Sequence, residues 1–363
     1  MKRILHVLGR MDRGGTESML MTYYRHIDRQ KCQFDFVVHT ENKCDFEDEI
    51  SSLGGKILRV PRFNMLNLWQ YRNAWHKLFA SHPEYKIIHI HHFLVAGIIL
   101  PIAAKYGVSI RIVHSHNTKP PIFLLKEKVM WIFHKDMLKY STLRLACSKD
   151  AGIYLFGNKD FDLLRNAIET ENYRYKESDR KKKRDEFGFR DNDFVVGHIG
   201  SFRTKQKNHG FLIDVFAEIA KRVPNAKLLL VGVGELQNEI KNKVCSLNLE
   251  DKCVFAGTRN DIPALLSSMD VFLFPSLFEG LSVVLIEAQA SGLPCVVSSV
   301  LSSETKLIDI FIQMGLNNPV QQWADTVLSL RVNKRRELYC DDVRIGGYDI
   351  KENVKKLEYI YQL

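Results

Sequence analysis

The sequence has no long uninterrupted hydrophobic run and no excess of proline or glycine. Its longest apolar stretch, residues 93–104, is too short to span a bilayer and contains Pro101. Only 10 prolines and 21 glycines occur in 363 residues, which excludes collagen-like and low-complexity chains. Because 45% of the residues are hydrophobic, the chain can bury large cores, and its length favours two domains.

Paired cysteines of the CxxC type and His/Cys patterns of zinc spacing are also missing. The seven cysteines are scattered along the chain. We therefore expect a reducing compartment, no disulfide framework, no metal and no cofactor. The chain enters an apolar strand pattern at residues 3–9 without the features of a signal peptide, so a cytoplasmic location is predicted.

Acidic residues are scarce between residues 50 and 145, where 14 Lys and Arg face three Asp and Glu. The rest of the chain is nearly neutral, although the whole carries a formal charge of +10. A basic excess confined to one region indicates an acidic partner there, such as nucleic acid, a phosphorylated substrate or an anionic membrane surface.

Short runs rich in Val, Ile and Leu alternate with helix-length segments along the whole chain. This alternation predicts an α/β fold of two doubly wound, Rossmann-like parallel-sheet domains that face a cleft. We place the domains at residues 1–170 and 171–363, with the option that the final helix packs back on the first. The basic run 180–184 is interpreted as the solvated face of a helix. The expected strands are 4–8, 34–38, 87–90, 110–113, 143–147, 194–199, 228–231, 254–256, 271–274 and 295–297.

The densest motif, residues 275–288, reads PSLFEGLSVVLIEA. A strand should end at Pro275, and a helix should begin near Ser282, whose hydroxyl can serve as the N-cap. Gly280 permits close approach to the backbone N–H groups of that helix start, which suits a phosphate or diphosphate. Glu279 in the loop and Glu287 in the helix are candidates for sugar and ribose hydroxyls.

Cations follow the first strand of the second domain, in the segment GHIGSFRTKQKNH at residues 197–209. Arg203 and Lys207 are candidates for neutralising a diphosphate leaving group. Two other patterns carry less weight. Asp191-Asn192-Asp193 has the spacing of a metal-binding DxD motif but is interpreted as a turn, and the segment 232–237 fails as a dinucleotide fingerprint.

In the first domain, a tight turn at residues 9–17 contains Gly14 and Gly15 and gives weak evidence of phosphate contact. A later strand ends in the segment His114-Ser115-His116-Asn117. Ligands of doubly wound sheets bind at the carboxyl ends of strands, so this segment should lie at the cleft.

Taken together, these segments resemble the family-4 retaining glycosyltransferases of GT-B fold, in the bacterial capsular and exopolysaccharide branch. Glu279 and Glu287 stand at the E-x7-E spacing of that family. The resemblance implies a nucleotide-diphosphate sugar donor, most commonly a UDP-sugar, bound by the second domain. It also implies an acceptor on the first domain and metal-independent transfer with retention at the anomeric carbon.

The resemblance also implies roles for individual residues. Glu287 would hold the ribose, Lys207 the diphosphate, and Glu279 with Gly280, Leu281 and Ser282 the donor sugar and diphosphate. Gly15 would lie under the phosphates, Gly14 and Asn117 on the acceptor side, and the catalytic histidine of the family is His114 or His116. The family usually has an arginine where this chain has Ser201, and Arg203 is the candidate replacement.

Several alternatives stay open at this point. The same architecture serves sugar-nucleotide epimerases and phosphorylases, and an inactive scaffold could bind a membrane surface or nucleic acid. The basic region 50–145 is interleaved with large apolar side chains, including Trp69 and Trp75. That mixture favours the inner face of the cell membrane and a saccharide or lipid-linked saccharide acceptor over nucleic acid. The alternative for the same region is a helix with an apolar core face and a solvated basic face.

Overall fold

The computed structural model describes residues 1–116, 124–279, 281–330 and 335–363, and within residues 124–131 it describes the helix but not the side chains. The chain forms two compact units. The first contains Met1–Ala167 and Ile350–Leu363, and the second contains Ile168–Asp349. The chain therefore crosses between units at residue 167, and its last helix belongs to the first unit.

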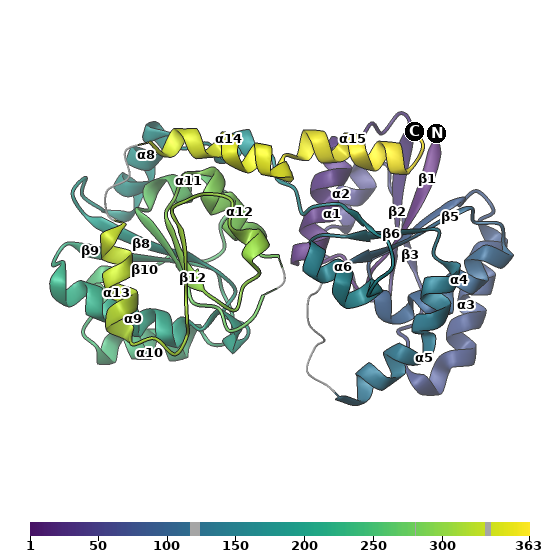
Figure 1. Cartoon of the computed structure of the whole chain (residues 1–363), viewed down its shortest axis with the longest axis horizontal. Helices are drawn as coiled ribbons and strands as arrows, with labels where there is room; N and C mark the ends of the chain where they lie inside the picture. The colour runs from purple at the N-terminus through teal and green to yellow at the C-terminus, as the bar shows by residue number, and fades with distance from the viewer. Residues whose placement is uncertain (117–123, 280, 331–334) are drawn as a thin grey trace. The chain divides into compact units, whose positions relative to one another are not determined.

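The first unit is built on a seven-stranded parallel sheet of order β3-β2-β1-β4-β5-β6-β7 (Figure 1). The order reverses between β1 and β4, which are neighbours in the sheet but not in the sequence. The strands are β1 Lys2–Val7, β2 Cys32–Val38, β3 Ile57–Arg59, β4 Ile87–Ile90, β5 Ile110–Ser115, β6 Leu143–Ala146 and β7 Asp162–Leu163. The helices are α1 Gly15–His26, α2 Glu47–Ser52, the 3₁₀ turn η1 Met65–Asn67, α3 Leu68–Ser81, α4 Phe93–Lys105, α5 Leu124–Tyr140, α6 Lys149–Phe156 and α15 Ile350–Ile360.

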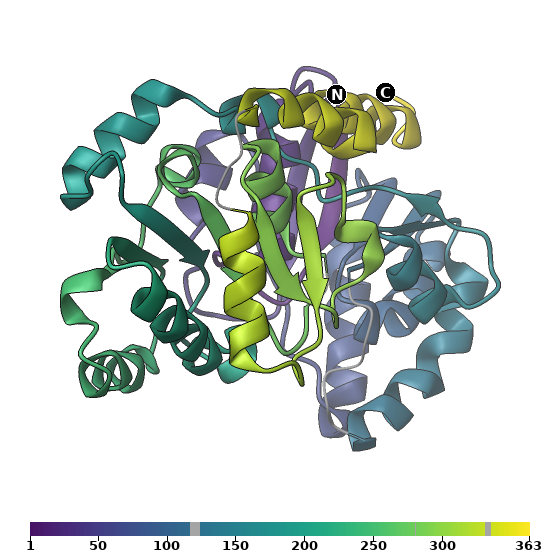
Figure 2. The same ribbon diagram turned by 60° about the vertical axis from the view of Figure 1, so that its left-hand side comes forward.

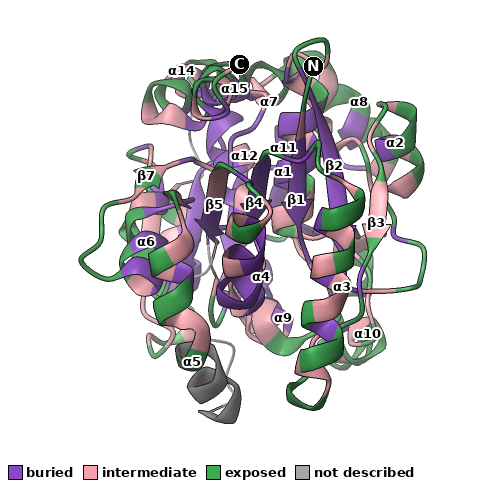
Figure 3. Cartoon of the chain, turned by 90° about the vertical axis from the view of Figure 1, so that its right-hand side faces the viewer, coloured by how far each residue is buried: buried purple, intermediate pink, exposed green. Residues whose placement is uncertain are grey.

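The strands β1, β4 and β5 lie in the buried middle of the first unit (Figure 3). Helix α4 is apolar around most of its circumference, as expected of a helix covered on several sides. A Cβ on Gly97 would lie 1.8 Å from the Phe133 carbonyl oxygen, so this glycine allows α5 to approach α4 closely. No described helix is long and apolar enough to cross a membrane.

Helix α15 completes the core of the first unit by packing on α1. Leu357 and Tyr361 bury their side chains there, and the Tyr361 hydroxyl makes a 2.7 Å hydrogen bond with His89 Nδ1. The C-terminal segment is thus part of the same hydrophobic cluster as Phe34 and Tyr23.

The second unit is built on a six-stranded parallel sheet of order β10-β9-β8-β11-β12-β13. Its order reverses between β8 and β11. The strands are β8 Phe194–Ile199, β9 Ala226–Val231, β10 Cys253–Phe255, β11 Val271–Phe274, β12 Cys295–Ser298 and β13 Phe311–Met314. The α-helices are α7 Thr170–Tyr173, α8 Glu177–Phe187, α9 His209–Arg222, α10 Gln237–Ser246, α11 Ile262–Ser268, α12 Val283–Ala290, α13 Val320–Ser329 and α14 Tyr339–Val343. Short turns are η2 Lys205–Lys207, η3 Glu250–Lys252, η4 Ser303–Thr305, η5 Arg336–Leu338 and the π-helical turn η6 Arg344–Tyr348.

Helices α9 and α13 lie together over the second sheet (Figure 2). Trp323 and Val327 of α13 are fully buried in the same cluster as Phe216 of α9 and Leu273 of β11. The ten strands expected from sequence all form, while β3, β7 and β13 were not expected. These three strands are two to four residues long and lie at or next to sheet edges, where a short half-buried segment carries little hydrophobic signal.

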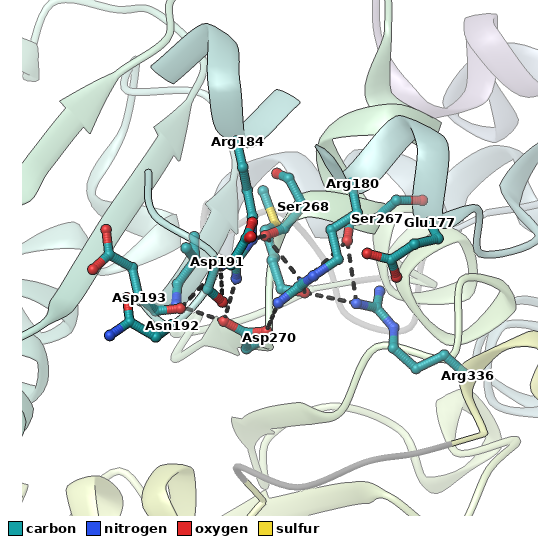
Figure 4. A network of polar contacts seen from close by, with 12 residues as sticks. Glu177, Arg180, Arg184, Asp191, Asn192, Asp193, Ser267, Ser268, Asp270 and Arg336 are labelled. Atoms are coloured by element: carbon teal, nitrogen blue, oxygen red, sulfur yellow. Dashed lines mark hydrogen bonds and ion pairs between the residues drawn. The ribbon is translucent and has the colours of Figure 1, made fainter. Parts of the chain in front are cut away.

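Two arginines of α8 share one carboxylate of the second unit (Figure 4). Arg180 Nη2 and Arg184 Nη2 each donate to a different oxygen of Asp270 at 2.7 Å. Arg184 is 1% exposed, and its other N–H groups donate to backbone carbonyls, including those of Ser268 and Asp193. The pair holds α8 against the start of β11.

The interpretation of the basic run 180–184 as a solvated face is therefore wrong in part. Lys181 and Lys182 are exposed, but Lys183 and Arg184 are buried and Arg180 is partly buried. The long stems of these side chains let the charged ends reach carboxylates and carbonyls beneath the helix. The segment Asp191-Asn192-Asp193 forms the expected turn before β8.

Arg336 is also buried in this region (Figure 4). Its guanidinium donates to the carbonyls of Leu266, Met269 and Ser291, and it lies 4.5 Å from the centre of the Tyr175 ring. Burial lowers its pKa to about 10. The contacts fasten the segment before α14 to the carboxyl end of α11.

We expect Asp270→Ala to destabilise the second unit by about 3–5 kcal/mol, because it leaves two largely desolvated guanidinium groups without their carboxylate. Calorimetric unfolding measures this loss. The control is Asp325→Ala, which removes an exposed partner of Arg222 and should cost less than about 1 kcal/mol. Equal losses in both variants would contradict the assignment.

Candidate active site

The motifs of the second unit converge at the point where its strand order reverses. The loop after β8, residues 200–208, and the loop after β11, residues 275–282, follow neighbouring parallel strands. The carboxyl ends of β8 and β11 therefore lie at the same edge of the sheet, and both loops begin there. Ligands of doubly wound sheets bind at such a reversal, because the connections on either side leave in opposite directions.

Hydrogen bonds join these two loops directly. The Leu277 amide donates to the Gln206 carbonyl at 2.8 Å, and Gln206 Nε2 donates to the Phe278 carbonyl at 2.9 Å. Asn208 Nδ2 donates to the Pro275 carbonyl at 3.1 Å. The two loops thus form one connected surface.

Lys207 and Glu279, predicted from separate motifs, form an ion pair across this junction. Lys207 Nζ lies 2.7 Å from Glu279 Oε1 and 4.6 Å from the centre of the Phe274 ring. The side chains are 17% and 9% exposed. The ammonium is therefore held at a defined position but still reaches solvent.

The glycines of segment 232–237, which do not form a dinucleotide-binding fingerprint, have a structural role. A Cβ on Gly234, whose φ is +157°, would lie 2.2 Å from the Phe202 carbonyl carbon. The Phe202 amide donates to the Val233 carbonyl at 3.0 Å. This close approach braces the loop that carries Arg203 and Lys207.

Helix α12 begins at the same edge of the sheet. Ser282 is its N-cap residue, as predicted, but the Ser282 hydroxyl makes no capping hydrogen bond. The expectation that this hydroxyl caps the helix is therefore wrong, and the amides of the first turn lack a side-chain acceptor among the described residues. Leu281 and Ser282 are buried, whereas Gly280 lies outside the described residues.

Glu287, one turn further along α12, accepts a 2.7 Å hydrogen bond from the Tyr173 hydroxyl of α7. Burial raises the pKa of Glu287 to about 7, and the bond from Tyr173 opposes that rise. The carboxyl therefore changes charge near neutral pH. Tyr173 is a site residue that sequence reasoning missed, because 114 residues separate it from its partner.

Arg203 and Ser201 are both exposed in the loop after β8. The Arg203 amide donates to the Ser201 hydroxyl at 3.2 Å. Among the described residues the Arg203 guanidinium makes no hydrogen bond or ion pair. Arg203 therefore lies on the same loop as Lys207, and its guanidinium is available to an anionic ligand.

In the first unit, Gly14 and Gly15 lie at the start of α1, at the end of the loop that follows β1. Gly14 is the N-cap residue, and as a glycine it offers no side chain to cap the helix. Gly15 is exposed. These glycines therefore lie at the carboxyl edge of the first sheet, beside the reversal between β1 and β4.

Histidines gather at the same edge. His114 at the end of β5 is fully buried, and His116 is partly exposed, so His116 is the one of the two that reaches the surface of its unit. His116 Nε2 lies 2.9 Å from His91 Nδ1. Sequence reasoning missed His91 and its neighbours His6 and His89, although the pattern His-x-His at residues 89–91 was visible. Asn117 lies outside the described residues.

Comparison with known proteins identifies the family. Residues 13–171 match the model described as Glycosyltransferase Family 4, and residues 193–331 match Glycosyl transferases group 1. The chain is 34% identical over 373 aligned positions to EpsF of Bacillus subtilis, which is classed as a glycosyltransferase, covering 100% of this chain and 97% of EpsF. The chain is a family 4 glycosyltransferase.

Other relatives of this glycosyltransferase agree. It is 28% identical to an Escherichia coli protein named UDP-Gal:alpha-D-GlcNAc-diphosphoundecaprenol alpha-1,3-galactosyltransferase, covering 77% of this chain and 75% of that protein. The solved structure of Anabaena HepE in complex with UDP matches with a TM-score of 0.82 and 19% identity over the whole of both chains. The two Rossmann-like sheets and these structural neighbours show the GT-B fold.

Changing Glu287 should alter how the stability of this glycosyltransferase depends on pH. The folded protein binds the Glu287 proton more tightly than the unfolded chain does, since its pKa rises from 4.5 to about 7. Stability should therefore fall as pH rises through this interval. Glu287→Gln lacks that titration, so its melting temperature relative to the wild type should increase from about pH 5 to about pH 8.

Tyr173→Phe is the companion variant for this measurement. It removes the hydrogen bond that favours the ionised carboxylate, so the fall in stability should move to higher pH. A difference between the melting temperatures of Glu287→Gln and wild type that stays constant with pH would refute the assignment.

Proposed function

We propose that this glycosyltransferase is a retaining enzyme that moves a sugar from a nucleotide-diphosphate donor, first of all a UDP-sugar, to a saccharide or lipid-linked saccharide during surface polysaccharide synthesis. The observation that carries the proposal is the Lys207–Glu279 pair beside the uncapped start of α12. The name of the E. coli relative contains a UDP-sugar and a diphosphoundecaprenol acceptor, and HepE was solved with UDP.

The donor diphosphate is assigned to Lys207, Arg203 and the first amides of α12. Negative charge grows on the diphosphate as its bond to the sugar breaks, and a fixed ammonium together with a helix N-terminus stabilises that charge. The backbone of Leu281 and Ser282 lies directly before the first turn of α12 and is assigned to the diphosphate, as is Gly280 from the sequence. Gly15 is assigned beneath the phosphates. This part of the proposal needs no metal ion on the diphosphate.

Two carboxyl groups are assigned to hydroxyl groups of the donor. Glu287 is far enough along α12 to receive the ribose hydroxyls, and its ionised form accepts hydrogen bonds from them. Glu279 is assigned to the hydroxyls of the transferred sugar, with Lys207 holding its orientation. Each carboxylate acts through positioned hydrogen bonds rather than through a covalent bond.

Retention follows from a transfer on one face of the sugar. The bond between the anomeric carbon and the diphosphate oxygen breaks, the acceptor oxygen bonds to the same face, and the acceptor proton passes to the departing diphosphate. No enzyme nucleophile is required. Burial lowers the pKa of His116 to about 3, so in this proposal His116 orients the acceptor as a neutral ring. Gly14 and Asn117 are assigned to the acceptor from the sequence.

We also propose that the first unit contacts the inner face of the cell membrane from the cytoplasm. Leu66 is 99% exposed and Trp69 is 77% exposed, and the exposed Arg62 and Arg72 lie in the same segment. Such apolar and basic side chains together favour an anionic lipid surface. Trp75, expected in this face from sequence, belongs to the core instead. Lys119, Lys126 and Lys128, which flank the apolar residues 122–138 in the sequence and were expected in the same face, have side chains outside the described residues.

Lys207→Ala should lower the transfer rate by about 10²–10³-fold, because it removes the charge assigned to the leaving diphosphate. Chromatography of a reaction with UDP-sugar and acceptor measures both released UDP and glycosylated acceptor. Lys221→Ala, an exposed lysine of α9, is the control and should act like the wild type. Near-normal transfer by Lys207→Ala refutes the role of this lysine, and an epimerised donor or a sugar phosphate as product refutes transfer itself.

The double variant Leu66→Ser, Trp69→Ser should bind phosphatidylglycerol vesicles at least about tenfold more weakly than the wild type. Each large apolar side chain contributes about 1.5–3 kcal/mol when it leaves water. Vesicle sedimentation measures the loss. Leu338→Ser changes an exposed apolar residue of the second unit and should have no effect. Equal binding by all three proteins would contradict the membrane contact.

A further inference from the structure

Five histidines from three neighbouring strands share one face of the first sheet. His6 and His89 are register partners on β1 and β4. His91 directly follows β4, His114 is near the end of β5, and His116 directly follows β5. Residues two apart on an extended strand point to the same face, so each His-x-His pair presents both of its rings together. Ring centres lie 4.3 Å apart for His89 and His91 and 4.1 Å apart for His114 and His116.

Hydrogen bonds connect some of the ring nitrogens. His6 Nδ1 lies 3.1 Å from His91 Nε2, and His91 Nδ1 lies 2.9 Å from His116 Nε2. His89 Nδ1 bonds to the Tyr361 hydroxyl. In each histidine pair one ring must donate and the other accept, so the accepting ring must be neutral at the shared atom.

Other buried ring nitrogens of this group have no hydrogen-bond partner within the described chain. They are His6 Nε2, His89 Nε2, His116 Nδ1 and both nitrogens of His114. The backbone of Leu164 lies near the His114 ring and favours its protonated form, but the two groups make no hydrogen bond of normal geometry. Buried polar atoms without partners are rare, because each costs about 1–3 kcal/mol. So many in one place indicate a ligand that accepts nitrogen lone pairs.

We propose that His91, His114 and His116 bind a divalent late transition metal ion, with Zn²⁺ as the first candidate. One ring nitrogen from each of the three histidines lies within 4.8 Å of the other two. Tetrahedral zinc with bonds of about 2.0–2.1 Å requires nitrogens about 3.3 Å apart, so small movements of the rings close the site. The metal would replace the hydrogen bond between His91 and His116.

The geometry of the cluster suits metal binding. Both nitrogens of His114 and Nδ1 of His116 have no hydrogen-bond partner among the described residues, so each of these rings can offer a nitrogen to an ion. His6 is positioned to support the site, because its 3.1 Å contact with His91 Nε2 leaves His91 Nδ1 for the metal. Partners of this kind on the far nitrogen orient the ligands of many histidine sites.

A second set, His6, His89 and His91, also brings three nitrogens together. All three of its members are buried, whereas His116 of the first set is partly exposed and gives the ion a route to the surface. Three neutral imidazoles leave the charge of the ion uncompensated. The fourth position is therefore assigned to hydroxide or to an anionic oxygen of a bound molecule.

Lys207, Arg203 and the start of α12, which the proposed function assigns to the diphosphate, belong to the second unit and take no part in this site. His116, assigned above to the acceptor, is one of its ligands, so the ion would lie beside the assigned acceptor position. It differs from the sequence-based expectation of no metal, which rested on the absence of zinc spacing. The two His-x-His pairs, His89 with His91 and His114 with His116, were apparent in the sequence. That β4 and β5 place them side by side depends on the strand order.

The test uses the full chain without a histidine tag, stripped with a chelator and titrated with Co²⁺ and then Zn²⁺. We expect one Co²⁺ per chain with the visible absorption of tetrahedral cobalt, displaced by one Zn²⁺. His114→Asn and His116→Asn should each weaken binding at least about tenfold. His89→Asn, which removes a ligand of the inner set only, should retain the cobalt spectrum.

Circular dichroism establishes that each variant is folded. X-ray absorption of the zinc-loaded wild type gives a result that does not depend on any variant, with three imidazole nitrogens at about 2.0–2.1 Å expected. Sulfur ligands, fewer than two imidazoles, or no stoichiometric binding would overturn the proposal. So would loss of the metal in His89→Asn together with its retention in His114→Asn.

Discussion

The order of the parallel strands in each sheet is the constraint on which both candidate sites depend. In the second unit the reversal of that order makes β8 and β11 neighbours, and the loops that carry Lys207 and Glu279 meet there although 72 residues separate the two side chains. In the first unit the pairing of β4 with β5 brings together His91, His114 and His116, and the reversal between β1 and β4 adds His6 beside His89. Parallel strands must all end at one edge of the sheet, so polar residues placed after them collect in one place.

Buried polar groups have more hydrogen-bond partners around Asp270 than they have at the two candidate sites. Around Asp270 the guanidinium groups of Arg180 and Arg184 have carboxylate or carbonyl partners, so desolvation of the charges is offset by hydrogen bonds. At the sites, Glu287 keeps a single described partner, and the ring nitrogens of His114 keep none. Polar groups left short of partners in this way are the ones that a ligand can satisfy.

Much of the fold could be predicted because apolar runs and helix-length segments alternate clearly. The motif around Glu279 and Glu287 was also visible, since a loop glycine and a helix start leave a local signal. The predictions that were wrong concerned the burial of long charged side chains and the capping of a helix. Arg184 looked like a solvated charge and is buried, and Ser282 stands at the helix start without capping it. Those outcomes depend on what lies beneath α8 and beside α12, which no local pattern contains.

The sequence by itself determined the family and the two parallel sheets, and it supplied the candidate residues that we propose for a diphosphate. Only the tertiary structure decided that Lys207 pairs with Glu279, that Tyr173 donates to Glu287 and that five histidines share one face. The physical reason is that propensity and periodicity act over a few residues along the chain. Side-chain contacts, by contrast, are set by strand order and by packing between segments that are distant in sequence.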